Sequence, residues 1–203
     1  DTAFIKENGE FTFNVATNKN GLYGLGVSDQ NAITIYFDSL TKIQKVTIND
    51  LARLSSDYTV EGNEVSENIA GFTVEVNAMR ALGSRLNNQS KELDFNDTTA
   101  LKALYDEFQE KSEIFLEKRN NFITENMESP ALIVVLDQID PNQEFDLLKE
   151  VIVDGLGKSI PNTFHYKSLL GYLQQAEAEK IKKAQMENFL KPGSPAPDLN
   201  YPG

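Results

Sequence analysis

The 203-residue chain contains no cysteine, and histidine occurs once, at position 165. The lack of cysteine excludes disulfides, cysteine-ligated zinc and thiol catalysis within these residues. Long apolar runs are also missing: the longest, residues 131–136, is far shorter than the roughly eighteen residues of a transmembrane helix. With 40% hydrophobic and 25% charged residues, the composition is that of a globular chain of one or two domains.

Basic residues are few, because 19 Lys and Arg stand against 31 Asp and Glu, for a net charge of −12. Binding to a phosphate backbone needs clustered positive charge. The one basic cluster, Lys180, Lys182 and Lys183, lies late in an expected helix, where it complements the helix dipole. We therefore expect no nucleic-acid partner.

The first sixty residues alternate apolar and polar side chains, the pattern of half-buried antiparallel strands. Turn residues at 8–9, 20–21 and 28–31 separate the segments. About five short strands are expected, forming one sheet or half of a sandwich. The clearest candidates are residues 11–15, 32–38, 45–49 and 58–62.

From residue 63 the apolar residues recur at helical spacing, and about five helices are expected. Expected N-caps are Asn63, Asp97, Ser129 and Asp140, the last two followed by proline at the first helical position. Gly155 or Gly157 is expected to end the fourth helix, and the last is expected from about 162 to 190. Phe108, Phe115 and Phe122 recur every seventh residue, which indicates a long helix packed lengthwise against another.

Strands followed by helices indicate an α+β fold with an N-terminal antiparallel β-sheet or half-sandwich and an all-helical domain. We predict a β-module at residues 1–62, a helical domain at 63–191 and a final segment at 192–203.

Catalytic, metal and cofactor sites are not predicted. Gly21, Gly24 and Gly26 lack the spacing and the following helix of a phosphate loop, and are interpreted as strand and turn glycines. His165 is interpreted as structural, and a hydrolase that uses it is the least favoured alternative. An acidic cluster lacks the glycine and glutamate of an EF-hand and is interpreted as caps and first-turn charges; it comprises Asp137, Asp140, Asn142, Glu144 and Asp146.

The segment 192–203 stops the helix with Pro192 and Gly193, and its remaining prolines require extended backbone. Its Gly-x-x-Ala-Pro-Asp-Leu pattern resembles the opening of thioredoxin-like domains of the alkyl hydroperoxide reductase / thiol-specific antioxidant superfamily; the matching residues are Gly193, Ala196, Pro197, Asp198 and Leu199. This resemblance implies that residues 192–203 are a linker and the first strand of such a domain.

The upstream chain is similar to the region that precedes this domain in exported Bacteroidota thiol-disulfide oxidoreductases. The matching residues are Gly9, Phe11, Phe13, Gly21, Leu22, Tyr23, Val60, Gly62, Asn63, Pro130 and Leu132–Leu136. The family's β-module usually begins with one or two more strands than are found here. The family's redox Cys-x-x-Cys lies downstream of this segment, so no catalytic role carries over to any residue here.

The resemblance implies a non-catalytic N-terminal region of an exported oxidoreductase that positions a redox domain and offers a docking or dimer surface. The expected location is the periplasm or outer membrane, with a possible lipid anchor outside the chain. Expected partners are a protein or substrate protein, a second copy, or a membrane complex. The alternative is a stand-alone interaction or ligand-binding lipoprotein module, such as an accessory subunit of an outer-membrane complex.

Three triplets resemble the Asp-(Ser/Thr)-small-apolar pattern used for O-glycosylation in that bacterial group. They make Thr2, Ser39 and Thr98 candidate acceptors. For Thr98, the preceding Asp97 is equally well explained as a helix N-cap.

Overall fold

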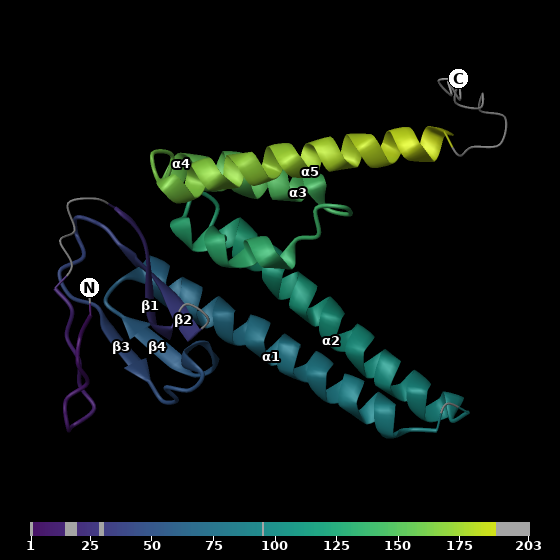
Figure 1. Ribbon diagram of the computed structural model, residues 1–203, viewed down its shortest axis with the longest axis horizontal. Coiled ribbons are helices and arrows are strands. Elements are labelled where there is room, and N and C mark those ends of the chain that lie inside the picture. The colour runs from purple at the N-terminus through teal and green to yellow at the C-terminus, as the bar shows by residue number, and fades with distance from the viewer. Residues whose placement is uncertain (1, 15–19, 29–30, 95, 190–203) are drawn as a thin grey trace, which may run out of the picture. The chain divides into compact units, whose positions relative to one another are not determined.

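The computed structural model describes residues 2–14, 20–28, 31–94 and 96–189 (Figure 1). It divides into two compact units, Asp1–Ala70 and Gly71–Gly203. All strands lie in the first unit, and all helices after α1 lie in the second. The fold class is therefore α+β, with an N-terminal β-module followed by helices.

The described strands form two small antiparallel hairpins in the first unit (Figure 1). Strand β1, Gly21–Ser28, pairs with β2, Asn31–Phe37, and the register shifts at a bulge between Gly26 and Ser28. Strand β3, Lys45–Ile48, pairs with β4, Tyr58–Glu61, and the short 3-10 helix η1, Leu54–Ser56, lies between them in sequence. The glycines at 21, 24 and 26 are thus strand residues, as interpreted above.

One predicted strand is wrong in its described part, because residues 11–14 form no strand. Phe11 and Phe13 instead make an edge-to-face ring contact with centroids 5.8 Å apart. Val15, the last residue of that prediction, lies outside the described residues.

The core of the first unit joins both hairpins to the first turns of α1, Glu64–Glu92. Ile33 and Ile35 of β2 are buried, as the alternation predicts. Tyr36, which alternation places on the opposite face of the strand, is buried as well. The backbone N–H of Tyr36 donates to Ser66 Oγ (2.8 Å) in α1, which ties β2 to this helix. The buried members of this core are Ile33, Ile35, Leu54, Tyr58, Val60 and Ala70.

Helix α1 begins where the sequence predicts. The side chain of Asn63 accepts from the Ser66 N–H (3.0 Å), the hydrogen bond of an N-cap. Gly62 before it has φ +101°, and a Cβ there would clash with the carbonyl of Ile43. Only glycine tolerates that backbone conformation easily, so the step into the helix is fixed locally.

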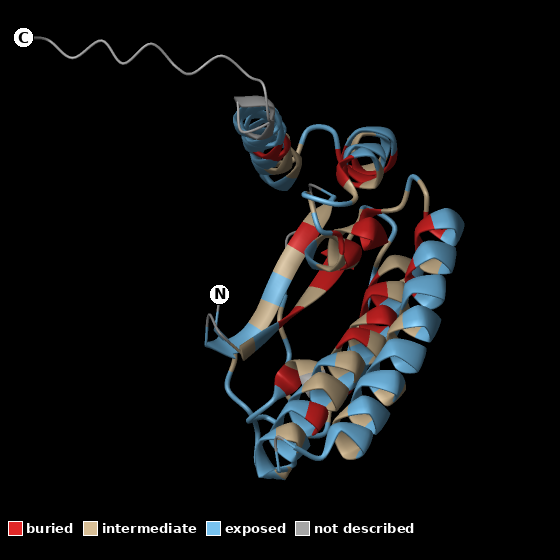
Figure 2. Cartoon of the chain, turned by 90° about the vertical axis from the view of Figure 1, so that its right-hand side faces the viewer, coloured by how far each residue is buried: buried red, intermediate tan, exposed pale blue. Residues whose placement is uncertain are grey.

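In the second unit, the part of α1 after Ala70 runs antiparallel beside α2, Thr98–Glu125 (Figure 2). Asp97 caps α2 by accepting from the Ala100 N–H (3.0 Å). Phe72 contacts the rings of Phe115 and Phe122, which confirms the lengthwise packing that the seven-residue repeat predicts. Ion pairs Lys118–Glu75 and Arg85–Glu107 follow the same antiparallel register.

The remaining helices form the core of the second unit. They are the 3-10 helix η2, Pro130–Gln138, then α3, Phe145–Lys149, the π-helix η3, Glu150–Leu156, α4, Gly157–Ser159, and α5, Phe164–Phe189. Ser129 caps η2 as predicted, accepting from the Ala131 N–H (3.2 Å). The fully buried residues here are Ala131, Leu132, Val135, Leu148, Val151, Ile152 and Leu156.

Two predictions about the fourth helix are wrong. Asp140 does not cap it: its carboxylate accepts from the Asn142 N–H (2.9 Å) in a local turn, and the helix starts at Phe145. Helical structure then continues through Gly155 and Gly157 to Ser159. Both glycines serve close packing, since a Cβ at 155 would overlap Leu132 and one at 157 would overlap the Tyr166 hydroxyl.

Candidate functional site

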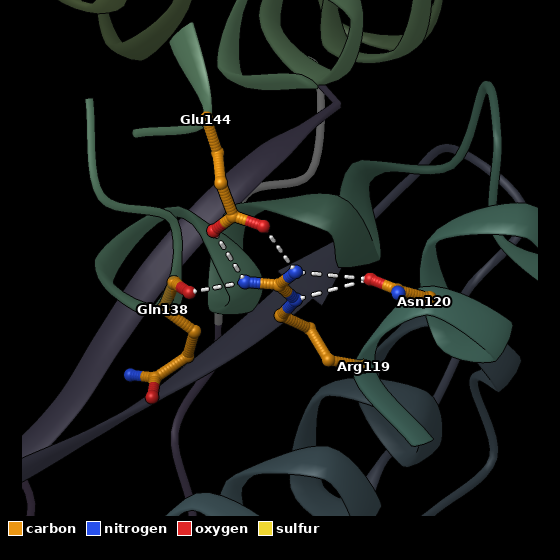
Figure 3. Close-up of polar contacts among 4 residues, drawn as sticks. All are labelled: Arg119, Asn120, Gln138 and Glu144. Atoms are coloured by element: carbon orange, nitrogen blue, oxygen red, sulfur yellow. Dashed lines mark hydrogen bonds and ion pairs between the residues drawn. The ribbon is translucent and has the colours of Figure 1, made fainter. Parts of the chain in front are cut away.

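Among the described residues of the second unit, Arg119 is a buried charged residue, 2% exposed, whose guanidinium makes several hydrogen bonds (Figure 3). Its two Nη atoms donate to both carboxylate oxygens of Glu144 at 2.8 and 2.7 Å. Nη1 also donates to the Gln138 carbonyl (2.7 Å), while Nε and Nη2 donate to Asn120 Oδ1 (3.2 and 3.0 Å). All five N–H donors of the arginine are therefore used.

This arrangement joins α2 to the end of η2 and to the residue before α3. A bidentate carboxylate pair is the strongest form of such a contact. Arg119 lowers the pKa of Glu144 below its ordinary value, chiefly through the hydrogen bonds it donates to the carboxylate. Since every donor is satisfied within the chain, the group acts as a structural clamp.

An open groove of about 360 Å³ is lined by residues of α3 and of the second half of α5. Phe145 is one of its lining residues, and the Lys180 ammonium lies 4.7 Å from the centre of the Phe145 ring, a cation–π contact. Lys180 also approaches Asp146 at 4.0 Å, although the Asp146 side chain is 98% exposed. An exposed pair of this kind contributes little stability. The full lining is Phe145, Asp146, Lys149, Glu177, Lys180, Ile181 and Ala184.

Apolar surface from Phe145, Ile181 and Ala184 is flanked by charges of both signs, which suits an apolar side chain on a charged segment. Among the residues that the structure describes, no group of three or more metal-ligating side chains occurs.

The three candidate glycosylation residues are all exposed, and they lie in separate segments. Thr2 is in the irregular N-terminal segment, Ser39 is in the turn after β2, and Thr98 is the first residue of α2. Asp38 before Ser39 holds this turn, because its carboxylate accepts from the Thr41 hydroxyl (2.7 Å) and from two backbone N–H groups. These bonds, chiefly that of the Thr41 hydroxyl, lower the pKa of Asp38.

His165 lies in the first turn of α5, as predicted, and is exposed beside the ring of Phe164 at 6.3 Å. It is therefore no part of the buried core. Two members of the acidic cluster around residue 140 make different contacts. The Asp140 carboxylate accepts a hydrogen bond within a turn, and the Glu144 carboxylate forms an ion pair with Arg119. In the described parts of the chain, no helix is long and apolar enough to cross a bilayer.

The motif residues Gly193, Ala196, Pro197 and Asp198 lie outside the described residues, as does the strand expected after them. The chain matches no protein-family model, no curated protein and no solved structure.

Sequence reasoning missed both the clamp and the groove. Arg119 and Glu144 are 25 residues apart, and neither differs from the surrounding surface charges in the sequence. The sequence shows the basic cluster at Lys180, but the contact of Lys180 with Phe145 depends on the packing of α3 on α5, which the sequence does not show.

Proposed function

We propose that this chain is the non-catalytic N-terminal region of an exported thiol-disulfide oxidoreductase, and that it positions a thioredoxin-like redox domain. The observation that carries the proposal is the Gly-x-x-Ala-Pro-Asp-Leu segment at 193–199, which comes directly after a long helix. With 26 residues, α5 is about 39 Å long, and its C-terminal end would orient a following domain.

In the family's chemistry, a low-pKa thiolate of the downstream motif attacks a substrate disulfide, and the second cysteine resolves the mixed disulfide. The residues described here would supply orientation and a surface for a protein partner or substrate. The two β-hairpins of the first unit are one such surface. Membrane attachment would come only through a lipid anchor outside this chain.

The test is the intact mass of the protein from its native source, before and after thiol alkylation under reducing conditions. A species heavier than 22.7 kDa by about 100–150 residues, with at least two alkylatable thiols, is expected. As a control, the 203-residue chain alone should not reduce insulin disulfides, because it has no cysteine.

A native mass near 22.7 kDa without thiols, allowing for lipid or glycan, would contradict the proposal. That result would support the second candidate function, a stand-alone interaction module. The groove between α3 and α5 favours that candidate, since its mixed apolar and charged lining suits a protein ligand.

A further inference from the structure

The dipeptide Asn-Gly occurs twice in the chain, at residues 8–9 and 20–21. In such a pair the backbone nitrogen of the glycine can attack the side-chain carbonyl carbon of the asparagine, because glycine has no Cβ to hinder the approach. The attack is intramolecular and closes a succinimide ring, so it requires neither an enzyme nor a cofactor. Both pairs lie in the first unit, but their surroundings differ.

Asn8 lies in an exposed turn, residues 6–10, that is held by local hydrogen bonds. Its Oδ1 accepts from the Glu10 N–H (3.1 Å), and its Nδ2 donates to the Glu10 carboxylate (2.8 Å). The Gly9 N–H donates to the Lys6 carbonyl (2.9 Å), and nothing lies within 4 Å of the position of a Cβ on Gly9. Because these bonds are exposed to water, the turn opens at a small cost in free energy.

Asn20 is held by other elements of the first unit. Its Oδ1 accepts from the N–H of Ser39, in the turn after β2 (3.1 Å). Its side chain also hydrogen-bonds the hydroxyl of Tyr36, a residue that is 5% exposed. Gly21 is the first residue of β1 and pairs with Phe37 of β2. Attack at Asn20 therefore requires these contacts and the end of the β1–β2 hairpin to open first.

We propose that Asn8 is a site of spontaneous succinimide formation in the folded protein, and that the fold protects Asn20 from the same reaction. The Gly9 nitrogen gives its proton to a base and bonds to Asn8 Cγ. The Cγ–Nδ2 bond breaks, and the leaving nitrogen takes up a proton and departs as ammonia. Water then opens the ring at either carbonyl, which leaves aspartate or isoaspartate at position 8. This inference is independent of whether a redox domain follows the chain.

The modification changes the turn that carries it. The amide that donates to the Glu10 carboxylate is replaced by a second carboxylate, so a hydrogen bond becomes a repulsion between like charges. Isoaspartate also adds a carbon atom to the backbone within the turn. The Lys6 N–H, which donates to the Glu10 carbonyl (2.8 Å), then loses its alignment with this acceptor. Ageing of the protein therefore adds negative charge to this turn and opens it.

The experiment is a timed incubation of the whole folded chain at mildly alkaline pH, followed by peptide mapping with mass spectrometry. Asn8 should convert at least about tenfold faster than Asn20, because reaction at Asn20 must first break tertiary hydrogen bonds. In the urea-unfolded chain the two asparagines should convert at comparable rates, since each precedes a glycine and no fold protects either of them.

Two variants test the assignment. Tyr36→Phe removes the hydroxyl that bonds Asn20, so conversion at Asn20 should become about two- to tenfold faster while the rate at Asn8 stays unchanged. Asn8→Gln should abolish conversion at position 8 over the same period, because its longer side chain would have to close a larger ring. Circular dichroism verifies that each variant keeps its fold.

Equal conversion rates at Asn8 and Asn20 in the folded chain would overturn the proposal. So would an Asn8 that stays unmodified while the unfolded chain reacts. A rate difference that persists in urea would overturn it as well, because the flanking sequence and not the fold would then be its cause. An Asn20 rate that Tyr36→Phe leaves unchanged would refute the protection assigned to that contact.

Discussion

At the scale of single residues, Arg119 and Glu144 determine how the second unit responds to pH. The folded chain lowers the pKa of Glu144 below its ordinary value of 4.5, mainly through hydrogen bonds from Arg119. A carboxyl whose pKa falls on folding stabilises the protein above its unfolded pKa, and this stabilisation is lost as the pH falls through the folded pKa. Protonation of Glu144 would also leave a buried guanidinium without its counter-charge.

We therefore expect Glu144→Gln to lower the free energy of unfolding by about 2 kcal/mol at pH 7. The difference from wild type should shrink below about pH 4.5, as Glu144 of the wild type takes up its proton. Urea denaturation at pH 7 and at pH 3 measures both values. Glu117→Gln, an exposed change on α2, is the control and should cost less than about 0.5 kcal/mol at either pH. A cost for Glu144→Gln that is equal at both pH values would contradict this account.

At the scale of elements, the packing of the π-helix η3 requires a residue without a side chain at position 155. Gly155 is buried, and a Cβ there would overlap Leu132 Cδ1, which is itself fully buried in η2. Gly171 in α5 is the opposite case, because nothing lies within 4 Å of the position of its Cβ. The same substitution should therefore have opposite effects at the two positions.

Gly155→Ala should lower the free energy of unfolding by about 1–3 kcal/mol through overpacking. Gly171→Ala should raise it by about 0.5–1 kcal/mol, because alanine is the better helix former. Chemical denaturation of both single variants tests this pair. In the double variant Gly155→Ala/Leu132→Val, the smaller valine should recover part of the loss at 155; simple additivity of the two costs would refute the contact.

The sequence predicts helix starts best where the N-cap side chain bonds a nearby backbone N–H. Asn63, Asp97 and Ser129 cap helices because each side chain reaches an N–H two or three residues ahead. The prediction at Asp140 was wrong because its carboxylate accepts a hydrogen bond within a local turn. Aspartate side chains form such turns as readily as they cap helices, and the sequence does not distinguish the two. The clamp and the groove could not be predicted, since both join residues about 25 or more positions apart.

At the scale of the whole molecule, the chain divides into two compact units, the first with a core of its own, and we expect two thermal transitions in calorimetry. Ser66→Ala is the reporter for the first unit. Ser66 is 0% exposed and its hydroxyl bonds the backbone of Tyr36, so its loss should cost about 1–3 kcal/mol. Gly155→Ala is the reporter for the second.

Each variant should lower the midpoint of its own transition and leave the other nearly unchanged. A single transition that both variants shift equally would show that the units unfold as one. The acidic net charge of −12 applies to the whole chain, and we expect it to keep the protein soluble at neutral pH.

The close approach of Gly155 to Leu132 has a consequence for sequence variation. Position 155 can gain a side chain only where position 132 loses volume, so the two positions should covary among related chains. Arg119 and Glu144 should be linked in the same way, and lysine is a poor substitute for an arginine that uses all five donors. These two pairs form a four-position signature by which distant relatives of this helical unit could be recognised.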